Sequence, residues 1–403
     1  MDARDRIRRF VAVSSLAARV YLGYKAITVR QQGLLIKFGQ MLGSRPDLIP
    51  DEYVAILSRL QDQVPPRPFP VIERQITREL GRPLADVFSR FDRKPIASAS
   101  LAQVHRATLK DSRTVAVKVQ YPDIWEVVRT DLDSIRFLLR VLAALERNLD
   151  FRPIIEEISR NVPLELDFIN EGHNAELIAR NFAPRRDIIV PSIHWEHTTR
   201  RVLVMEFLEG IKITDVDALQ AAGIDPQAVS RLLTGAYCDQ LFLHGMFHAD
   251  PHPGNLFVRP GPQLVMLDFG LCRELDDRFR LGYAKLVNAM ITGNAPEMVG
   301  AFRDLGFRVK HANDPTPYLA MGRAFMESSA PGRAYADPDL VAEANARVAR
   351  AVRANPIVEI PREFLLIMRV TGLLSGLGKH LDSRVDVIGT FLPYTRAALE
   401  GTS

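Results

Sequence analysis

The sequence predicts an α+β fold of two lobes that follow a helical N-terminal extension. Three observations lead to this expectation. The first 94 residues show helical spacing interrupted by prolines, valines alternate with other residues over Thr114–Val119, and helical stripes dominate the chain after about residue 211. We therefore expect an extension over residues 1–94, a strand-containing lobe with a helical insert over 95–210, and a helical lobe over 211–403.

The composition is that of a globular protein and carries a small positive charge. The chain has 403 residues, of which 47% are hydrophobic and 25% charged, and its net charge is +4. This charge suits a polyphosphate ligand or an anionic membrane surface, and the lack of any Lys/Arg block excludes a nucleic-acid-binding tail. We expect no nucleic-acid partner.

The two cysteines, Cys238 and Cys272, provide no disulfide framework and favour a reducing compartment. The two longest apolar stretches, Phe10–Val29 and Phe364–Gly378, are interrupted by charged residues such as Arg369 and do not reach the length that a bilayer requires. The expected location is cytoplasmic, and a peripheral contact with a membrane is left open.

The extension is expected to be helical throughout. Residues 5–30 form an amphipathic stripe, for which packing on the protein is favoured over a membrane-surface role, and a helix near Pro70–Leu80 ends at Gly81. Between them lie Lys37 and Gln40, three residues apart on one helix face. Periodicity does not explain the role of these two residues.

The second part begins with small residues and continues as a β-hairpin. Ala97-Ser98-Ala99-Ser100 precede a strand, and Val115, Val117 and Val119 face one side of the next strand while Lys118 faces the other. A small-residue turn and a nearby lysine suit a nucleotide cleft, in which backbone approaches the phosphates and the lysine meets their oxygens. A plain amphipathic hairpin with a surface lysine is the alternative.

A cluster of carboxylates follows a helix expected over residues 124–148. Asp167 and Glu171 would be i,i+4 neighbours on a helix through Leu164–Phe182, and Glu165 adds a third carboxylate. Like charges at this spacing cost a few tenths of a kcal/mol unless a cation offsets them. Lys37, Lys118 or a metal ion are candidate partners. Strands at Ile188–Val190 and Arg201–Phe207 then lead to a hinge at Glu209-Gly210.

In the third part of the chain, over residues 211–403, a predicted helix leads into a polar loop. Asp225-Pro226 is a good helix start and Gly245 a good end. Asp250 and Asn255 then lie five residues apart, and Asp268-Phe269-Gly270 follows two short strand-like runs. This spacing fits metal-dependent phosphoryl transfer, with one Asp near the nucleophile and Asn255 and Asp268 on Mg²⁺. The alternative is a polar loop before a hairpin.

Helices account for the rest of the chain. The expected ranges are 276–291, 296–305, 315–328, 338–354 and 361–380, with a loop over 329–338. His244 and His248 are expected to be structural, because Mg²⁺ prefers oxygen ligands.

Four motifs together resemble the UbiB/AarF family of atypical protein-kinase-like proteins over roughly residues 30–285. They are Lys37-Phe38-Gly39-Gln40, the alanine-rich loop at Ala97–Ser100, Glu165-x-Asp167 with Glu171, and the pair of loops at His248–Asn255 and Asp268–Gly270. The resemblance implies a bilobal protein-kinase-like fold that binds ATP and Mg²⁺.

The resemblance also implies roles for individual residues. Lys118 would contact the phosphates and pair with Glu171, Asp250 would be the catalytic base, and Asn255 and Asp268 would ligate Mg²⁺. The nucleotide would be bound by Ala97, Ser98, Ala99, Ser100, Lys118, Met205 and Glu206. Lys37 and Gln40 would cover the cleft beside Glu165 and Asp167, where a peptide would otherwise lie.

The implied function is ATP hydrolysis, or transfer of phosphate to a small or lipid-like molecule, in support of ubiquinone or related isoprenoid-lipid metabolism. An isoprenoid lipid or quinone precursor is thus an expected partner. Because no long segment separates Gly270 from the helix expected over residues 276–291, phosphorylation of proteins in trans is not expected. The alternatives are a non-catalytic, nucleotide-gated lipid-binding scaffold and, ranked lower, a small-molecule kinase of the aminoglycoside or choline type, which has no reason to carry Lys37 and Gln40.

Overall fold

The computed structural model describes residues 66–99, 101–126, 128–129, 133, 164, 166–328, 338–383 and 385–401. The chain divides into two compact units, and each is described by itself. Unit one takes the chain up to Leu166 together with Trp195–Val204, and unit two takes Asp167–His194 and the chain from Met205 onward.

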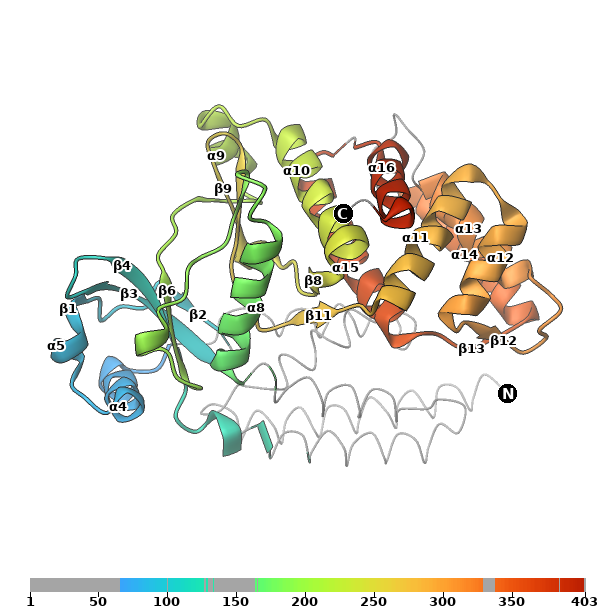
Figure 1. The fold of residues 1–403 in the computed structure, drawn as a ribbon. Coiled ribbons are helices and arrows are strands. Elements are labelled where there is room, and N and C mark those ends of the chain that lie inside the picture. Colours follow the sequence, from blue (N-terminus) through green and yellow to red (C-terminus); the bar gives the residue numbers. More distant parts are fainter. Residues whose placement is uncertain are drawn as a thin grey trace, which may run out of the picture. The chain divides into compact units, whose positions relative to one another are not determined.

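Unit one is a sheet with helices packed on it (Figure 1). The strands follow the order β1-β3-β4-β6, and β2 pairs with β3 outside that path. The elements are α4 (Phe69–Leu80), α5 (Leu84–Val87), β1 (Phe88–Phe91), β2 (Ala97–Ser98), β3 (Ala102–Leu109), β4 (Thr114–Gln120), the 3₁₀ turn η2 (Trp195–His197) and β6 (Val202–Glu206), whose last two residues belong to unit two.

The core of unit one follows from the alternation in β4. Val115, Val117 and Val119 are fully buried and pack in one cluster with Ile72 and Ile76 of α4. Full burial of a valine or isoleucine side chain contributes about 1.5–3 kcal/mol, so these five residues hold the helix on the sheet. The predicted hairpin and its inward-facing valines are confirmed.

A buried histidine makes unit one sensitive to acid. The His105 ring donates from Nδ1 to the Asp92 carbonyl at 2.8 Å and accepts at Nε2 from the Gln103 amide at 2.8 Å. Burial lowers the pKa of His105 below 6.5, with a partial offset from Asp92. As the pH drops below about 6.5, His105 binds a proton more readily in the unfolded chain than in the folded chain. The free energy of unfolding therefore falls as the pH drops below that value.

We expect the urea midpoint of the wild type to fall between pH 7.5 and pH 5.5, and to fall less in His105→Gln. Chemical denaturation followed by circular dichroism at the two pH values measures both slopes. Equal slopes in the two proteins would show that His105 does not contribute.

Unit two contains a four-stranded sheet, a two-stranded ribbon and most of the helices. Its sheet has the order β5-β10-β9-β7, and β8 pairs with β11. The first elements are α8 (Phe168–Asn181), β5 (Ile188–Ile189), β7 (Ile211–Lys212), α9 (Val216–Ala221), α10 (Pro226–Cys238), the π-helix η3 (Asp239–His244), β8 (Met246–His248), the 3₁₀ turn η4 (Pro253–Asn255), β9 (Leu256–Arg259), β10 (Gln263–Met266) and β11 (Cys272–Glu274).

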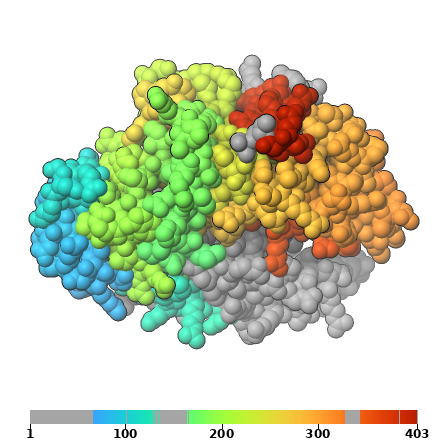
Figure 2. Space-filling model, in the orientation of Figure 1, coloured from blue at the N-terminus to red at the C-terminus, as the bar shows by residue number. Residues whose placement is uncertain are grey.

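Helices form the remainder of unit two. They are α11 (Asp277–Thr292), α12 (Ala295–Leu305), α13 (Thr316–Ser328), α14 (Pro338–Ala354), α15 (Arg362–His380) and α16 (Val387–Glu400), with a short β12 (Arg308–Val309) and β13 (Ile357–Glu359) pair among them. In Figure 2, α16 (red) lies at the surface beside α11, on which it packs. Within the described ranges, no helix is long and apolar enough to cross a membrane.

The helix ends explain why several predictions succeeded. Asp225 caps α10 by accepting from the Gln227 and Ala228 amides, and Gly245 and Gly293 end helical segments with φ of 66° and 68°. These are left-handed conformations that glycine adopts without steric cost.

One expectation about helices was wrong, and one helix was not predicted. The helix of the carboxylate cluster begins at Phe168, because Asp167 accepts from the Ile169 amide and acts as its N-cap. Asp is a preferred cap, so Asp167 precedes the helix on which Glu171 lies. The sequence also did not predict α16, which has Pro393 in its interior.

Candidate active site

Two loops of unit two carry the predicted phosphoryl-transfer residues. β8 leads into the loop that holds Asp250, and η4 ends this loop at Asn255. The β9–β10 hairpin then returns the chain, so that the Leu267 amide donates to the Asn255 carbonyl at 2.8 Å. This hydrogen bond brings Asn255 beside the residue that precedes Asp268.

His248 connects the two loops through one imidazole ring. Its Nε2–H donates to the Asp268 carbonyl at 2.6 Å, and its Nδ1 accepts from the Asp250 amide at 3.2 Å. The ring is fully buried, and the Phe269 ring packs edge-on against it with centroids 5.5 Å apart. Both ring nitrogens are used by backbone groups, which supports the structural role expected for this histidine.

Asp268 has a backbone conformation that is uncommon outside glycine. Its φ is 61°, in the left-handed region that Asp and Asn tolerate better than most residues. The side chain accepts from the Gly270 amide at 3.3 Å. This turn and the His248 bond together hold Asp268 in place, which is the preorganisation that charge stabilisation requires.

Helix α8 supports the same turn. Asn174 donates from its amide to the Phe269 carbonyl at 2.9 Å. A methyl group added at Gly270 would lie 3.4 Å from Asp268 Oδ1 and 3.7 Å from Glu171 Oε2, so the two carboxylates flank this glycine. Glu171 is only 2% exposed. Burial, and then the charges of Glu171 and Asp268, raise the pKa of the nearby Cys272 thiol, which stays protonated and unreactive at neutral pH.

Arg369 is a site residue that the sequence did not reveal. Its guanidinium lies 3.3 Å from Asp250 Oδ1, and it comes from α15, 119 residues further along the chain. The Asp250 side chain is still 37% exposed, so a substrate can reach it. The sequence showed Arg369 only as a charge inside an apolar stretch. A partly buried arginine needs a carboxylate partner, and that requirement could have suggested the pair.

The predicted nucleotide-binding residues of unit one lie on its hairpins. Lys118 is half-buried on the face of β4 opposite the three valines, level with Val104 of β3. Of the small-residue segment, Ala97 and Ser98 form strand β2, the Ala99 amide donates to the Ala102 carbonyl at 2.8 Å, and the Tyr121 hydroxyl donates to the Ala99 carbonyl at 3.2 Å. Ser98 Oγ lies 3.0 Å from the Tyr121 hydroxyl oxygen.

Other predicted residues are divided between the units or lie outside the described part of the chain. In unit two, Met205 is buried, and exposed Glu206 accepts from the Ser192 amide and hydroxyl at 3.3 and 3.1 Å. The pairing of Lys118, in unit one, with Glu171, in unit two, stays a prediction. The residues outside the described ranges are Lys37, Gln40, Ser100 and Glu165.

The donor set of unit two fits a magnesium ion. Asn255 and Asp268 offer an amide and a carboxylate oxygen, and Mg²⁺ in nucleotide sites takes one or two such ligands and completes its shell with phosphates and water. Among the described residues, no group of three or more His, Cys, Asp or Glu could hold a metal ion by itself, so a magnesium ion here would depend on the phosphates of a bound nucleotide as well as on Asn255 and Asp268.

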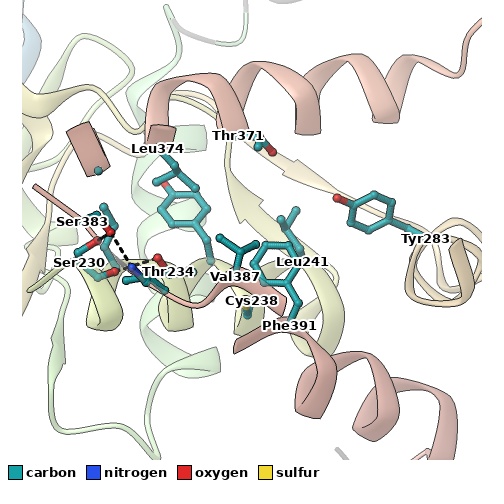
Figure 3. A pocket seen from close by; sticks show the side chains of 14 residues that line it. Ser230, Thr234, Cys238, Leu241, Tyr283, Thr371, Leu374, Ser383, Val387 and Phe391 are labelled. Atoms are coloured by element: carbon teal, nitrogen blue, oxygen red, sulfur yellow. Dashed lines mark hydrogen bonds between the residues drawn. The ribbon is translucent and has the colours of Figure 1, made fainter. Parts of the chain in front are cut away.

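A cavity of about 40 Å³ lies elsewhere in unit two, between α10, α11, α15 and α16 (Figure 3). Two of its hydroxyls have hydrogen-bond partners of different kinds: Ser230 donates to the Ser383 hydroxyl at 2.7 Å, and Thr234 donates to the backbone carbonyl of Ser230 at 2.9 Å. At roughly 10–15 Å³ for each water, the volume suits about three or four water molecules. It is too small for a nucleotide and is not the candidate site.

Comparisons with known proteins show which family this chain belongs to. The family model of the ABC1 atypical kinase-like domain matches residues 59–301. This chain belongs to the ABC1/AarF family. Among curated relatives, AarF domain-containing protein kinase 1 of Gallus gallus is 34% identical over 92% of this chain and 73% of its own length. The protein of the same name from Xenopus tropicalis is 36% identical over 87% and 69%.

Other members of the family carry kinase names. A probable serine/threonine-protein kinase of Dictyostelium discoideum, abkB, is 38% identical over 66% of this chain and 41% of its own length. Among solved structures, Rv3197 of Mycobacterium tuberculosis, determined in a complex with erythromycin, has a TM-score of 0.66 at 22% identity and covers 97% of this chain and 100% of its own. The α+β, kinase-like fold expected from the motifs is thereby confirmed.

Proposed function

We propose that this protein binds ATP with Mg²⁺ and hydrolyses it slowly, or transfers its terminal phosphate to a small or lipid-like acceptor. The observation that carries the proposal is the His248 bridge, which joins the Asp250 loop to the carbonyl of Asp268. A phosphoryl-transfer centre depends on positioning and charge neutralisation more than on covalent chemistry. A rigid link between its base and its metal ligand meets that need.

The residues of unit two would divide the chemistry among them. Asp250 accepts the proton of the attacking water or hydroxyl as the new bond to phosphorus forms and the bond to the ADP oxygen breaks. Mg²⁺, held by Asn255 and Asp268, would neutralise the phosphate charge. The peptide platform of a protein kinase has no counterpart between Gly270 and α11, because β11 follows at once and pairs with β8. This supports a small or lipid-like acceptor.

The pathway part of the proposal is support of ubiquinone or related isoprenoid-lipid metabolism. Its support is family membership, so an isoprenoid lipid or quinone precursor is the acceptor or regulator to try first. A peripheral membrane contact fits the mild positive charge of the chain.

Phosphate release from Mg-ATP by the purified full chain tests the proposal. It is measured with and without anionic liposomes and a quinone precursor, in the wild type and in Asp268→Asn. Turnover in the wild type that depends on Mg²⁺ and is lost in the variant supports it. Equal phosphate release by both proteins would refute it.

Lys118→Ala should weaken ATP binding about 10- to 100-fold, because a charge-assisted hydrogen bond to phosphate is worth about 1.5–3 kcal/mol. Calorimetric titration with the nucleotide measures the change. Lys110→Ala is the matched control, since Lys110 is an exposed lysine in the turn of the same hairpin. An ATP affinity unchanged by Lys118→Ala would remove this residue from the site.

The second candidate function is a nucleotide-gated scaffold that binds isoprenoid lipid without turnover. The Arg369–Asp250 ion pair favours it, because the Arg369 guanidinium occupies one oxygen of the carboxylate that an attacking water or hydroxyl would have to reach. Thermal stabilisation by ATP without phosphate release, even with liposomes and a quinone precursor present, would select this function.

A further inference from the structure

The end of α10 contains an irregular turn with a buried glutamine. After Cys238 the helix continues as a π-helix over Asp239–His244 and stops at Gly245. π turns are rare and are found frequently at functional sites. Gln240 lies in this turn and is fully buried, so both ends of its side-chain amide require partners.

Gln240 satisfies this requirement with two backbone groups. Its Oε1 accepts from the His248 amide at 2.8 Å, and its Nε2 donates to the Ala236 carbonyl at 3.1 Å. A backbone N–H can only donate and a carbonyl can only accept, so one orientation of the glutamine amide serves both. The side chain therefore links α10 to β8 in a defined geometry.

The His248 amide depends on this link because of its place in β8. The neighbouring Ala249 amide donates to the Leu271 carbonyl at 2.8 Å, toward β11. Successive backbone amides of a strand point to opposite edges, so the His248 amide points away from β11. Within the described residues, β8 pairs with no strand other than β11. Gln240 provides the hydrogen-bond partner for the edge of β8 that faces away from β11 at this position.

We infer that Gln240 is a positioning residue for the phosphoryl-transfer centre, an inference that rests on the proposed function of that centre. Gln240 fixes the His248 backbone, and the His248 ring in turn contacts the Asp250 amide and the Asp268 carbonyl. A shift of this one residue moves the catalytic base and a metal ligand together. Gln240 acts on the reaction through His248 and is not a catalytic residue.

Gln240→Leu replaces the amide by an apolar side chain of similar size and leaves the His248 amide and the Ala236 carbonyl without it. We expect turnover of ATP to fall about 10- to 100-fold, the size of loss that small displacements of catalytic groups produce. The KM for ATP should stay within about twofold, since the change affects positioning rather than nucleotide contacts.

The matched control is Asn355→Leu, in the same unit. Asn355 is also a buried amide that joins backbone groups: its Oδ1 accepts from the His311 amide at 2.8 Å, and its Nδ2 donates to the His311 carbonyl at 3.1 Å. None of these hydrogen bonds of Asn355 involves the Asp250 loop or the Asp268 loop. Both leucine variants should lower the melting temperature, but Asn355→Leu should keep the kcat of the wild type. Equal losses of kcat in the two variants would overturn the inference.

A conservative variant gives a second, pH-dependent readout. In Gln240→Glu the protonated carboxyl can donate to the Ala236 carbonyl and accept from the His248 amide, whereas the charged form cannot donate. The kcat of this variant, relative to that of the wild type, should therefore rise as the pH is lowered. A constant ratio across the pH range would contradict the assigned bonds.

Hydrogen exchange separates this inference from the proposed function. The His248 amide should exchange at least tenfold faster in Gln240→Leu than in Asn355→Leu, whether or not ATP is turned over. If the wild type shows no Mg-dependent ATP hydrolysis, the proposed function fails, and the exchange rates still test the link. Exchange of the His248 amide that is equally slow in both variants overturns the inference.

Discussion

Asp268→Asn is expected to lower Mg-dependent ATP turnover by at least about 100-fold while leaving the fold intact. Loss of a residue that merely supports a metal ligand already costs about 10- to 100-fold, so loss of the charged ligand itself should cost no less. The fold should persist because Asn tolerates the left-handed φ of 61° at this position as well as Asp does. Phosphate release as a function of Mg²⁺ concentration measures the effect.

The same substitution should leave the melting temperature unchanged or raised. Asp268 and the buried Glu171 both lie within 4 Å of the position that a Cβ at Gly270 would take, and removal of one negative charge relieves their repulsion. The control is Asp277→Asn, which removes an exposed carboxylate nearby in the chain, 2.9 Å from Arg280. That control should keep full turnover. A destabilised Asp268→Asn protein with normal activity per folded molecule would contradict the assignment of Asp268 to the metal.

Asp250→Asn is expected to lower turnover by about 10²- to 10⁴-fold with ATP affinity retained. The range is that of a lost general base, and the nucleotide contacts proposed for this protein lie on other residues. Single-turnover phosphate release and equilibrium nucleotide titration, measured on the same preparation, separate the two effects. The Arg369 guanidinium can still donate to the amide oxygen, so the contact with α15 should survive in weakened form.

A different outcome would identify a different role for Asp250. If Asp250→Asn weakened ATP binding as much as turnover, Asp250 would serve the nucleotide rather than the proton transfer. If neither changed, the Arg369 pair would be structural, and the scaffold function would gain support.

The parts of the fold that could be predicted are those set by local physical rules. Alternation placed Val115, Val117 and Val119 in the core because successive side chains of a strand point to opposite faces. Helix ends were found where a residue type is strongly preferred, as at Asp225 and Gly245. The two loops of the site could also be predicted, because Asp250, Asn255 and Asp268 lie in short segments of the chain and their spacing is visible in the sequence.

The parts that could not be predicted depend on contacts between distant segments. Arg369 meets Asp250 across 119 residues, and its own neighbourhood in sequence is simply an apolar helix. Gln240 and Asn174 each form a hydrogen bond with a backbone group. Every residue type has such groups, so the partner residue shows no pattern in the sequence. Asp167 was misassigned because a helix stripe and a helix cap can share the same spacing, and only the capping hydrogen bond distinguishes them.

The origin of Arg369 in α15 has a consequence for how the protein is made. The ribosome adds about 5–20 residues per second, so Asp250 is synthesised roughly 6–24 s before the arginine that contacts it. Phe364, Ile367, Val370 and Leu377 of the same helix belong to the core of unit two. A nascent chain that has only reached residue 301, where the match to the family model ends, lacks both this arginine and these core side chains. We therefore expect unit two to complete its folding after synthesis of α15, and chains shortened before Arg362 to expose apolar surface and aggregate.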